Sequence, residues 1–130
     1  MPLHTTAAEM VARARERIRE IDTADLMNRM GDSDLVIVDI RDVRERQRLG
    51  YIPGSYHAPR GMIEFWIDPS SPYHKTIFAD ETKTFVFHCA SGWRSALTVE
   101  TLMNMGFDAA HLRDGFTDWV AKGGPVEGLE

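Results

Sequence analysis

The chain has 130 residues and a formal net charge of −5, and 43% of its residues are hydrophobic. This length suits one domain with a substantial core, and the acidic balance argues against nucleic-acid binding. No apolar stretch approaches the ~20 residues of a membrane span. The first residues show no secretory pattern, so we expect a cytoplasmic protein without a membrane partner. One cysteine excludes an intramolecular disulfide and a multi-cysteine metal site.

The first quarter of the chain is predicted to be helical. Apolar residues recur at helical spacing over residues 7–21, and the arginines between them are expected to face solvent or, alternatively, an acidic partner. Thr23 is expected to cap a short helix over residues 24–30. We expect residues 1–33 to form a helical extension that packs on a main domain of residues 34–127.

The middle of the chain begins with a short, continuous apolar run at residues 35–38, which is typical of a buried parallel strand. Asp42 and Glu45 have the spacing of a capping pair for a helix that runs to residue 49. A turn and a second short strand over residues 55–58 should follow, and then a short helix over 61–67.

The last third of the chain alternates strands with helices. Residues 84–88 and 109–112 are predicted strands, and residues 95–105 and 115–121 are predicted helices. This alternation indicates an α/β domain with a mainly parallel sheet, in which ligands bind beyond the carboxyl ends of the strands. Cys89 lies at such an end.

Cys89 is the strongest candidate for a reactive residue. The backbone amides of residues 90–95, the dipole of the following helix and Arg94 should all favour a thiolate there. A thiolate can hold one extra sulfur as a persulfide, and Gly92 permits the tight loop that this requires. We expect the sulfur to be reachable at the mouth of the loop. The alternative is an inert, buried cysteine.

Other residues near this loop are candidates for supporting roles. Ser95 can cap the helix or bond the sulfur. Trp93 either walls the pocket or is a half-exposed aromatic residue, and Arg60 is a candidate second contact for an anion. Asp39 and Arg41 are interpreted as a structural ion pair. His88 directly precedes the cysteine on a strand, so its side chain should point to the opposite face.

Four segments together resemble the motifs of one family, in the same order: VDIR (38–41), GYIPGS (50–55), CASGWRS (89–95), and DGFTDW (114–119) followed by GPV (124–126). On these motifs the chain resembles a single-domain rhodanese, a sulfurtransferase. Tyr51 stands where the family usually has His, and Asp114 replaces the first Gly of the closing pair. Both departures lie outside the reactive loop.

The resemblance implies a three-layer α/β fold, with helices on both faces of a five-stranded, mostly parallel sheet. It implies a sulfurtransferase that moves a sulfane sulfur from a donor such as thiosulfate to a thiophilic acceptor through a Cys89 persulfide, without a metal or cofactor. The implied substrate-binding residues surround that cysteine and are Ala90, Ser91, Gly92, Trp93, Arg94, Ser95 and Arg60.

The donor and the extent of turnover are open. Thiosulfate, mercaptopyruvate or a persulfide could donate sulfur, and cyanide, a thiol or a protein could accept it. A low-turnover persulfide carrier or sensing module that serves a partner protein is the main alternative. Phosphatase-like and arsenate-reductase-like enzymes are less favoured, because their loops place five residues between Cys and Arg, whereas this chain has four, residues 90–93.

Overall fold

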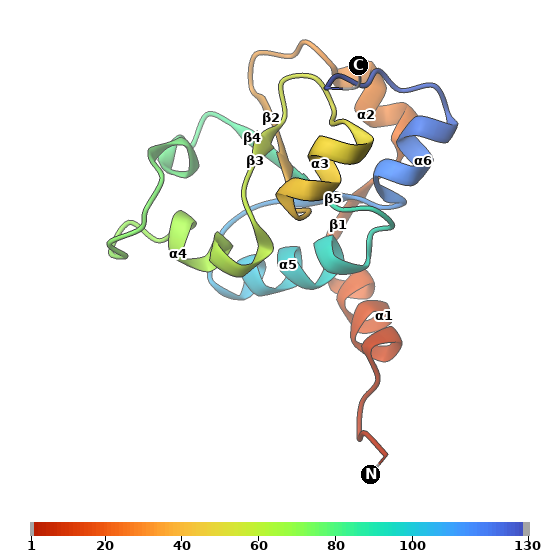
Figure 1. The fold of residues 1–130 in the computed structure, drawn as a ribbon. Coiled ribbons are helices and arrows are strands. Elements are labelled where there is room, and N and C mark those ends of the chain that lie inside the picture. The colour runs from red at the N-terminus through yellow and green to blue at the C-terminus, as the bar shows by residue number, and fades with distance from the viewer. Residues whose placement is uncertain (1, 129–130) are drawn as a thin grey trace.

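The computed structural model describes residues 2–128 and has a five-stranded sheet at its centre (Figure 1). The strand order is β1-β5-β4-β2-β3, and each of these neighbours pairs in parallel. The strands are β1 (Arg19–Ile21), β2 (Leu35–Asp39), β3 (Tyr56–His57), β4 (Thr84–His88) and β5 (Ala110–Leu112). The predicted α/β class and five-stranded sheet are confirmed.

Helices cover both faces of the sheet (Figure 1). They are α1 (Ala7–Arg17), α2 (Thr23–Arg29), α3 (Val43–Leu49), α4 (Ile63–Ile67), α5 (Trp93–Asn104) and α6 (Gly115–Ala121), with 3-10 turns η1 (Arg60–Met62) and η2 (Thr76–Ala79). Helices α4 and α5 lie on one side, and α2, α3 and α6 lie on the other. The three-layer arrangement is therefore confirmed. No helix among residues 2–128 is long and apolar enough to cross a membrane.

Two apolar cores follow from the alternation of side chains along the central strands. Phe85, Phe87 and Cys89 belong to the core under α4 and α5. Val86 belongs to the opposite core, where it packs with residues of α2 and α6 such as Trp119. Helix α1 lies outside both cores and packs against α5 through a third, smaller cluster.

The predicted helix over residues 7–21 is wrong in its last turn. Helix α1 ends at Arg17, and Ile18 is extended, with φ −101° and ψ 164°. Residues 19–21 form the edge strand β1 instead. Pairing with β5 supplies backbone hydrogen bonds that another helical turn would have made locally, and this tertiary pairing overrides the helical spacing.

Of the two predicted helix caps, the one at α3 is confirmed and the one at α2 is wrong. Asp42 and Glu45 do form a capping box at the start of α3. However, Asp22 rather than Thr23 caps α2, because its carboxylate accepts from the Asp25 amide at 2.8 Å. The Thr23 hydroxyl bonds Asp118 of α6 instead.

Residues 1–33 were expected to pack on the main domain as a helical extension. In the structure this segment also contributes to the sheet through β1, and Leu26 of α2 is fully buried in a core. The boundary at residue 33 stays a prediction.

Candidate active site

Cys89 lies directly after β4 and before α5, as the sequence indicates. Its Sγ accepts hydrogen bonds from the Gly92 amide at 3.2 Å and the Ser95 amide at 3.4 Å. The thiol also bonds the Ser95 hydroxyl at 3.5 Å. These donors lie at the N-terminus of a 12-residue helix, where the helix dipole favours negative charge. The sulfur therefore lies in a small anion-binding nest.

Two glycines bring the cysteine loop against the turn between β5 and α6. Gly92 has φ +88°, and a Cβ there would collide with the Arg113 carbonyl oxygen. Gly115 has φ +75°, and a Cβ there would collide with the Ala90 carbonyl. The close approach allows the Phe116 amide to donate to the Cys89 carbonyl at 2.9 Å. The loop is thus shaped by backbone contacts as well as by its own sequence.

The expectation of a freely reachable sulfur is wrong for the structure described. Cys89 is only 1% exposed, because it forms part of the core under α5. It nonetheless differs from an inert core cysteine, since its sulfur has three polar contacts. Trp93, the next bulky residue of the loop, is 49% exposed, so the site has an aromatic residue at its outer side.

Arg94 points toward α3 and forms a two-pronged ion pair with Glu45, at 2.8 and 3.1 Å. The hydrogen bonds that Arg94 donates to Glu45 are the main reason why the pKa of Arg94 is raised, and the nearby Cys89 contributes less. The same pair lowers the pKa of Glu45. Glu45 offsets part of the charge of Arg94, and the contact of Arg94 with an anionic donor stays a prediction.

Asp39 and Arg41 form the expected ion pair, and both are fully buried. Burial by itself raises the pKa of Asp39, but hydrogen bonds from Arg41 and the charges of His88 and Arg41 outweigh it and lower the pKa to about 2. Arg41 also donates to the Gly50 carbonyl at 2.8 Å. The pair therefore ties the end of β2 to the end of α3.

The remaining predicted residues take different positions. Arg60 pairs with Glu64 one helical turn away, at 2.9 Å, and its role as an anion contact stays a prediction. His88 points to the opposite side of the sheet from the Cys89 sulfur, where its ring stacks on Phe116, as predicted. Burial lowers the pKa of His88.

Asp114 explains one of the departures from the family motif. It precedes α6 with a negative φ of −105°, so this position does not require glycine. The left-handed conformation falls on Gly115, which this chain retains.

Two further residues, not expected from the sequence, lie at the site. His111 on β5 is fully buried, and its Nδ1 lies 2.8 Å from the Ser95 hydroxyl. Its Nε2 lies 2.8 Å from the carboxylate of Glu20 on β1. The sequence signal for His111 is a histidine near the carboxyl end of an otherwise apolar strand. The sequence gives no such signal for Glu20, because residues 7–21 are predicted to be helical.

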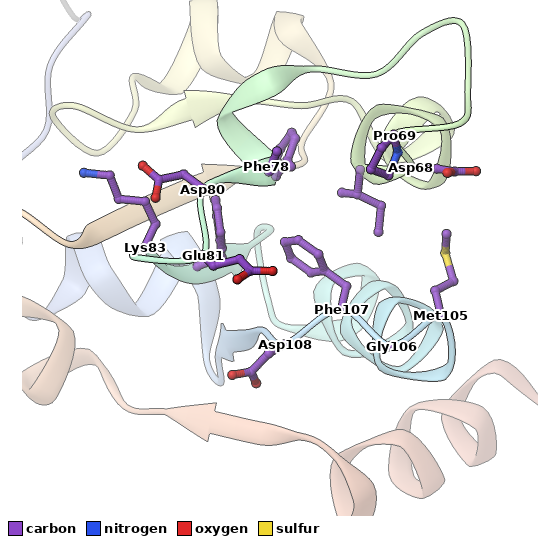
Figure 2. A pocket seen from close by; sticks show the side chains of 13 residues that line it. Asp68, Pro69, Phe78, Asp80, Glu81, Lys83, Met105, Gly106, Phe107 and Asp108 are labelled. Carbon is purple, nitrogen blue, oxygen red and sulfur yellow. The ribbon is translucent and has the colours of Figure 1, made fainter.

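A pocket of about 720 Å³ lies away from this loop (Figure 2). Its walls come from the segments that precede β4 and β5, including Phe78 and Phe107, with Asp80, Glu81 and Asp108 at its edge. Cys89 does not line it, because the cysteine lies at the carboxyl end of β4. Among residues 2–128, no three His, Cys, Asp or Glu residues are grouped so that they could hold a metal ion.

Comparison with known proteins agrees with this geometry. The family model of the rhodanese-like domain matches residues 22–122. The chain belongs to the rhodanese-like domain family. The match includes the cysteine loop and four of the five strands of the sheet, so the resemblance inferred from four motifs is confirmed.

Two curated relatives carry names that refer to sulfur transfer. The "Putative sulfurtransferase YtwF" of Bacillus subtilis is 30% identical over 109 residues, which are 83% of this chain and 96% of that protein. The mouse "Thiosulfate sulfurtransferase/rhodanese-like domain-containing protein 3" is 28% identical over 101 residues. That alignment covers 74% of this chain but only 64% of the mouse protein, so the mouse protein is the longer of the two.

Solved structures show the same rhodanese-like fold. A rhodanese-related protein from Thermoplasma volcanium superposes with a TM-score of 0.69 at 26% identity, covering 85% of this chain and 99% of its own. A Rhodopseudomonas palustris protein is more similar, with a TM-score of 0.93, 48% identity and 98% coverage of both chains. That protein is described as of unknown function and as a "Possible Tyrosine Phosphatase".

Proposed function

We propose that the protein is a sulfurtransferase whose Cys89 carries a sulfane sulfur as a persulfide. The observation that carries this proposal is the nest around Sγ, where two amides and one hydroxyl contact a single sulfur at the start of α5. The two amides donate to the sulfur, and such donors stabilise a thiolate and the terminal negative charge of a persulfide in the same way.

The proposed reaction has two steps. First, the loop moves aside from the sulfur, which is 1% exposed in the structure, and the Cys89 thiolate attacks the outer sulfur of the donor. The new S–S bond forms as the donor's S–S bond breaks, and thiosulfate would release sulfite with the bonding electron pair. Second, an acceptor such as cyanide attacks the outer sulfur, and Cys89 leaves as a thiolate. Neither step needs a metal, and the cysteine returns to its starting state.

Several substrates fit this scheme. Thiosulfate, mercaptopyruvate and a small or protein-borne persulfide are the candidate donors, and cyanide, a thiol or a protein thiol are the candidate acceptors. A reducing compartment such as the cytoplasm suits the protein, because it would keep the single cysteine from being oxidised.

Intact mass spectrometry tests the site directly. The wild type should gain one sulfur atom after brief exposure to a donor, and a reductant should remove it. Cys89→Ser should gain nothing under the same conditions. If none of these donors adds sulfur to the wild type, or if Cys89→Ser is loaded equally well, the proposal is wrong.

Turnover separates an enzyme from a carrier. Continuous formation of thiocyanate from thiosulfate and cyanide would support an enzyme. Stoichiometric loading of Cys89 without continued transfer to cyanide or a thiol would instead support a persulfide carrier that serves a partner protein.

A phosphatase is the second candidate, favoured by the description of the similar R. palustris protein. The loop argues against it, because only four residues separate Cys89 from Arg94 and because Arg94 is paired with Glu45. We therefore expect no hydrolysis of an aryl phosphate above that of Cys89→Ser. Sustained hydrolysis that depends on Cys89 would favour the phosphatase instead.

A further inference from the structure

Three polar side chains connect the cysteine sulfur to the edge of the sheet. The first contact joins Cys89 Sγ to Ser95 Oγ at 3.5 Å. The second joins Ser95 Oγ to His111 Nδ1, and the third joins His111 Nε2 to a Glu20 carboxylate oxygen, both at 2.8 Å. Ser95 and His111 are fully buried, whereas the Glu20 side chain is 24% exposed.

The fold holds this series of contacts in place. Glu20 and His111 are direct partners in the parallel pairing of β1 with β5, so their side chains project on the same side of the sheet. Arg15 of α1 contacts the same Glu20 carboxylate oxygen as His111, at 3.6 Å, and donates to the Arg113 carbonyl at 3.1 Å. The N-terminal segment thus supplies two of the charged groups behind the cysteine loop.

The hydrogen-bonding capacity of each group determines where the protons lie. A carboxylate can only accept, so His111 must donate its Nε2 proton to Glu20. The Nδ1 of a neutral imidazole is then an acceptor, which receives the Ser95 hydroxyl proton. The lone pairs of Ser95 Oγ remain available to the thiol proton of Cys89.

We propose that Ser95 and His111 remove the thiol proton from Cys89 and hold it as an imidazolium beside Glu20. The Sγ proton passes to Ser95 Oγ as the Ser95 hydroxyl proton passes to His111 Nδ1. The S–H bond breaks and an N–H bond forms, so a neutral thiol and a neutral imidazole become a thiolate and an imidazolium. The use of that thiolate in sulfur transfer rests on the proposed function, whereas the proton transfer itself needs no sulfur donor.

The charged groups around His111 are consistent with this role. Burial, the main cause, and the charge of Arg15 lower the pKa of His111, while Glu20 and Asp114 act to raise it. The balance favours a neutral imidazole, which is the form that can accept a proton. A thiolate on Cys89 then adds the negative charge that stabilises the imidazolium, so the two groups titrate as a pair.

Thiolate absorbance in the ultraviolet measures the proposal without any sulfur donor. Cys89 is the single cysteine, so subtracting a Cys89→Ala spectrum isolates its titration. His111→Asn can still bond Ser95 but cannot hold the proton. We expect it to raise the midpoint of the Cys89 thiolate titration by about one pH unit, so that at a pH below the midpoint the fraction of thiolate falls about tenfold. Ser95→Ala should raise the midpoint as well, and Ser95→Thr, which keeps the hydroxyl, should restore it.

Two variants provide matched controls. Thr98→Val removes another buried hydroxyl of α5, which bonds the Arg94 carbonyl. His88→Asn removes the buried imidazole on the opposite side of the sheet. Neither should move the midpoint. An unchanged midpoint in His111→Asn, or equal shifts in both controls, would overturn the proposal.

Nitrogen NMR of the histidine rings keeps the test valid if His111→Asn does not fold. The imidazolium of His111 should persist to higher pH in the wild type than in Cys89→Ala, because only the wild type forms the neighbouring thiolate. Identical titration of His111 in both proteins would overturn the relay. Failure of the wild type to form any persulfide, with these titrations as expected, would instead reject the sulfurtransferase proposal alone.

Discussion

Glu45 sets how much positive charge Arg94 presents beside the cysteine loop. Its carboxylate pairs with both terminal nitrogens of Arg94 and also bonds the Asp42 amide in the capping box of α3. An anionic donor that approaches Arg94 must therefore compete with a carboxylate already in place. This contact should make the site less favourable for a dianion such as thiosulfate.

Glu45→Gln should improve the use of thiosulfate. Glutamine keeps an acceptor for the capping box but removes the negative charge. Because the pair is partly exposed, its weakening should raise kcat/KM for thiosulfate by only about two- to fivefold, mainly through KM. Steady-state assays with thiosulfate and cyanide measure the effect.

Glu9→Gln is the matched control, because Glu9 has the same place in the capping box of α1 and lies far from Cys89 in the chain. Both variants should keep their capping boxes, and only Glu45→Gln should change kcat/KM for thiosulfate. An equal kcat/KM for thiosulfate in wild type and Glu45→Gln would show that Arg94 does not contact the donor.

At the scale of elements, the site depends on where β4 stops and α5 begins. Gly92 ends the loop in the left-handed conformation, and the Arg113 carbonyl leaves no room for a side chain there. The helix therefore starts at Trp93, two residues before the predicted start at residue 95. This early start places the Ser95 amide, in the first turn of α5, against the sulfur.

Gly92→Ala should destabilise the protein by about 2–4 kcal/mol, because strain at positive φ adds to a collision with backbone. It should also abolish loading of Cys89 with sulfur. Urea unfolding and intact mass measure the two effects.

Gly106→Ala separates strain from collision. Gly106 also has a positive φ, of +91°, but a Cβ there would meet no atom within 4 Å. We expect a cost of about 1 kcal/mol and normal loading of Cys89. If Gly92→Ala and Gly106→Ala lose similar amounts of stability and of Cys89 loading, the collision with the Arg113 carbonyl is unimportant.

Across the whole molecule, the carboxyl edge of the sheet gathers buried polar groups on both faces. One face holds Ser95 and His111 beside the sulfur, and the other holds the Asp39–Arg41 pair with His88. Burying a charged pair gives little net stability, but breaking it leaves one charge buried alone. The second group therefore makes stability depend on pH.

The Asp39 carboxylate should contribute to acid unfolding. Its pKa is lowered from 3.8 to about 2, so the folded protein favours the charged form and the unfolded chain takes up the proton first. This contribution, about 2 kcal/mol, is complete well above pH 3.8 and is lost as the pH falls through about 2. Urea unfolding across this range should show the decline.

Asp39→Asn should flatten this decline and lower stability at neutral pH by about 3–5 kcal/mol, because Arg41 is left buried without its counter-charge. Asp108→Asn, which changes an exposed aspartate, is the control. If the free energy of unfolding of Asp39→Asn declines with falling pH as steeply as that of the wild type, the pH dependence arises from other groups.

Local rules account for the parts of the site that the sequence predicted. A β-branched run, a capping pair and a strand followed by glycine and a helix each depend on neighbours within a few residues, so Leu35–Asp39, α3 and the position of Cys89 could be predicted. The same reasoning placed His88 on the opposite side, since alternation along a strand is also local.

The sequence by itself determined the α/β class, the place of Cys89 after a strand and the loop that follows it, because these follow from short-range periodicity and turn chemistry. Only the tertiary structure decided that residues 19–21 form a strand, that Glu45 holds Arg94 and that Glu20 meets His111. Those two side-chain pairs join residues 49 and 91 positions apart, and no local preference specifies such a contact. They arise from the register of β1 with β5 and from the packing of α3 beside α5.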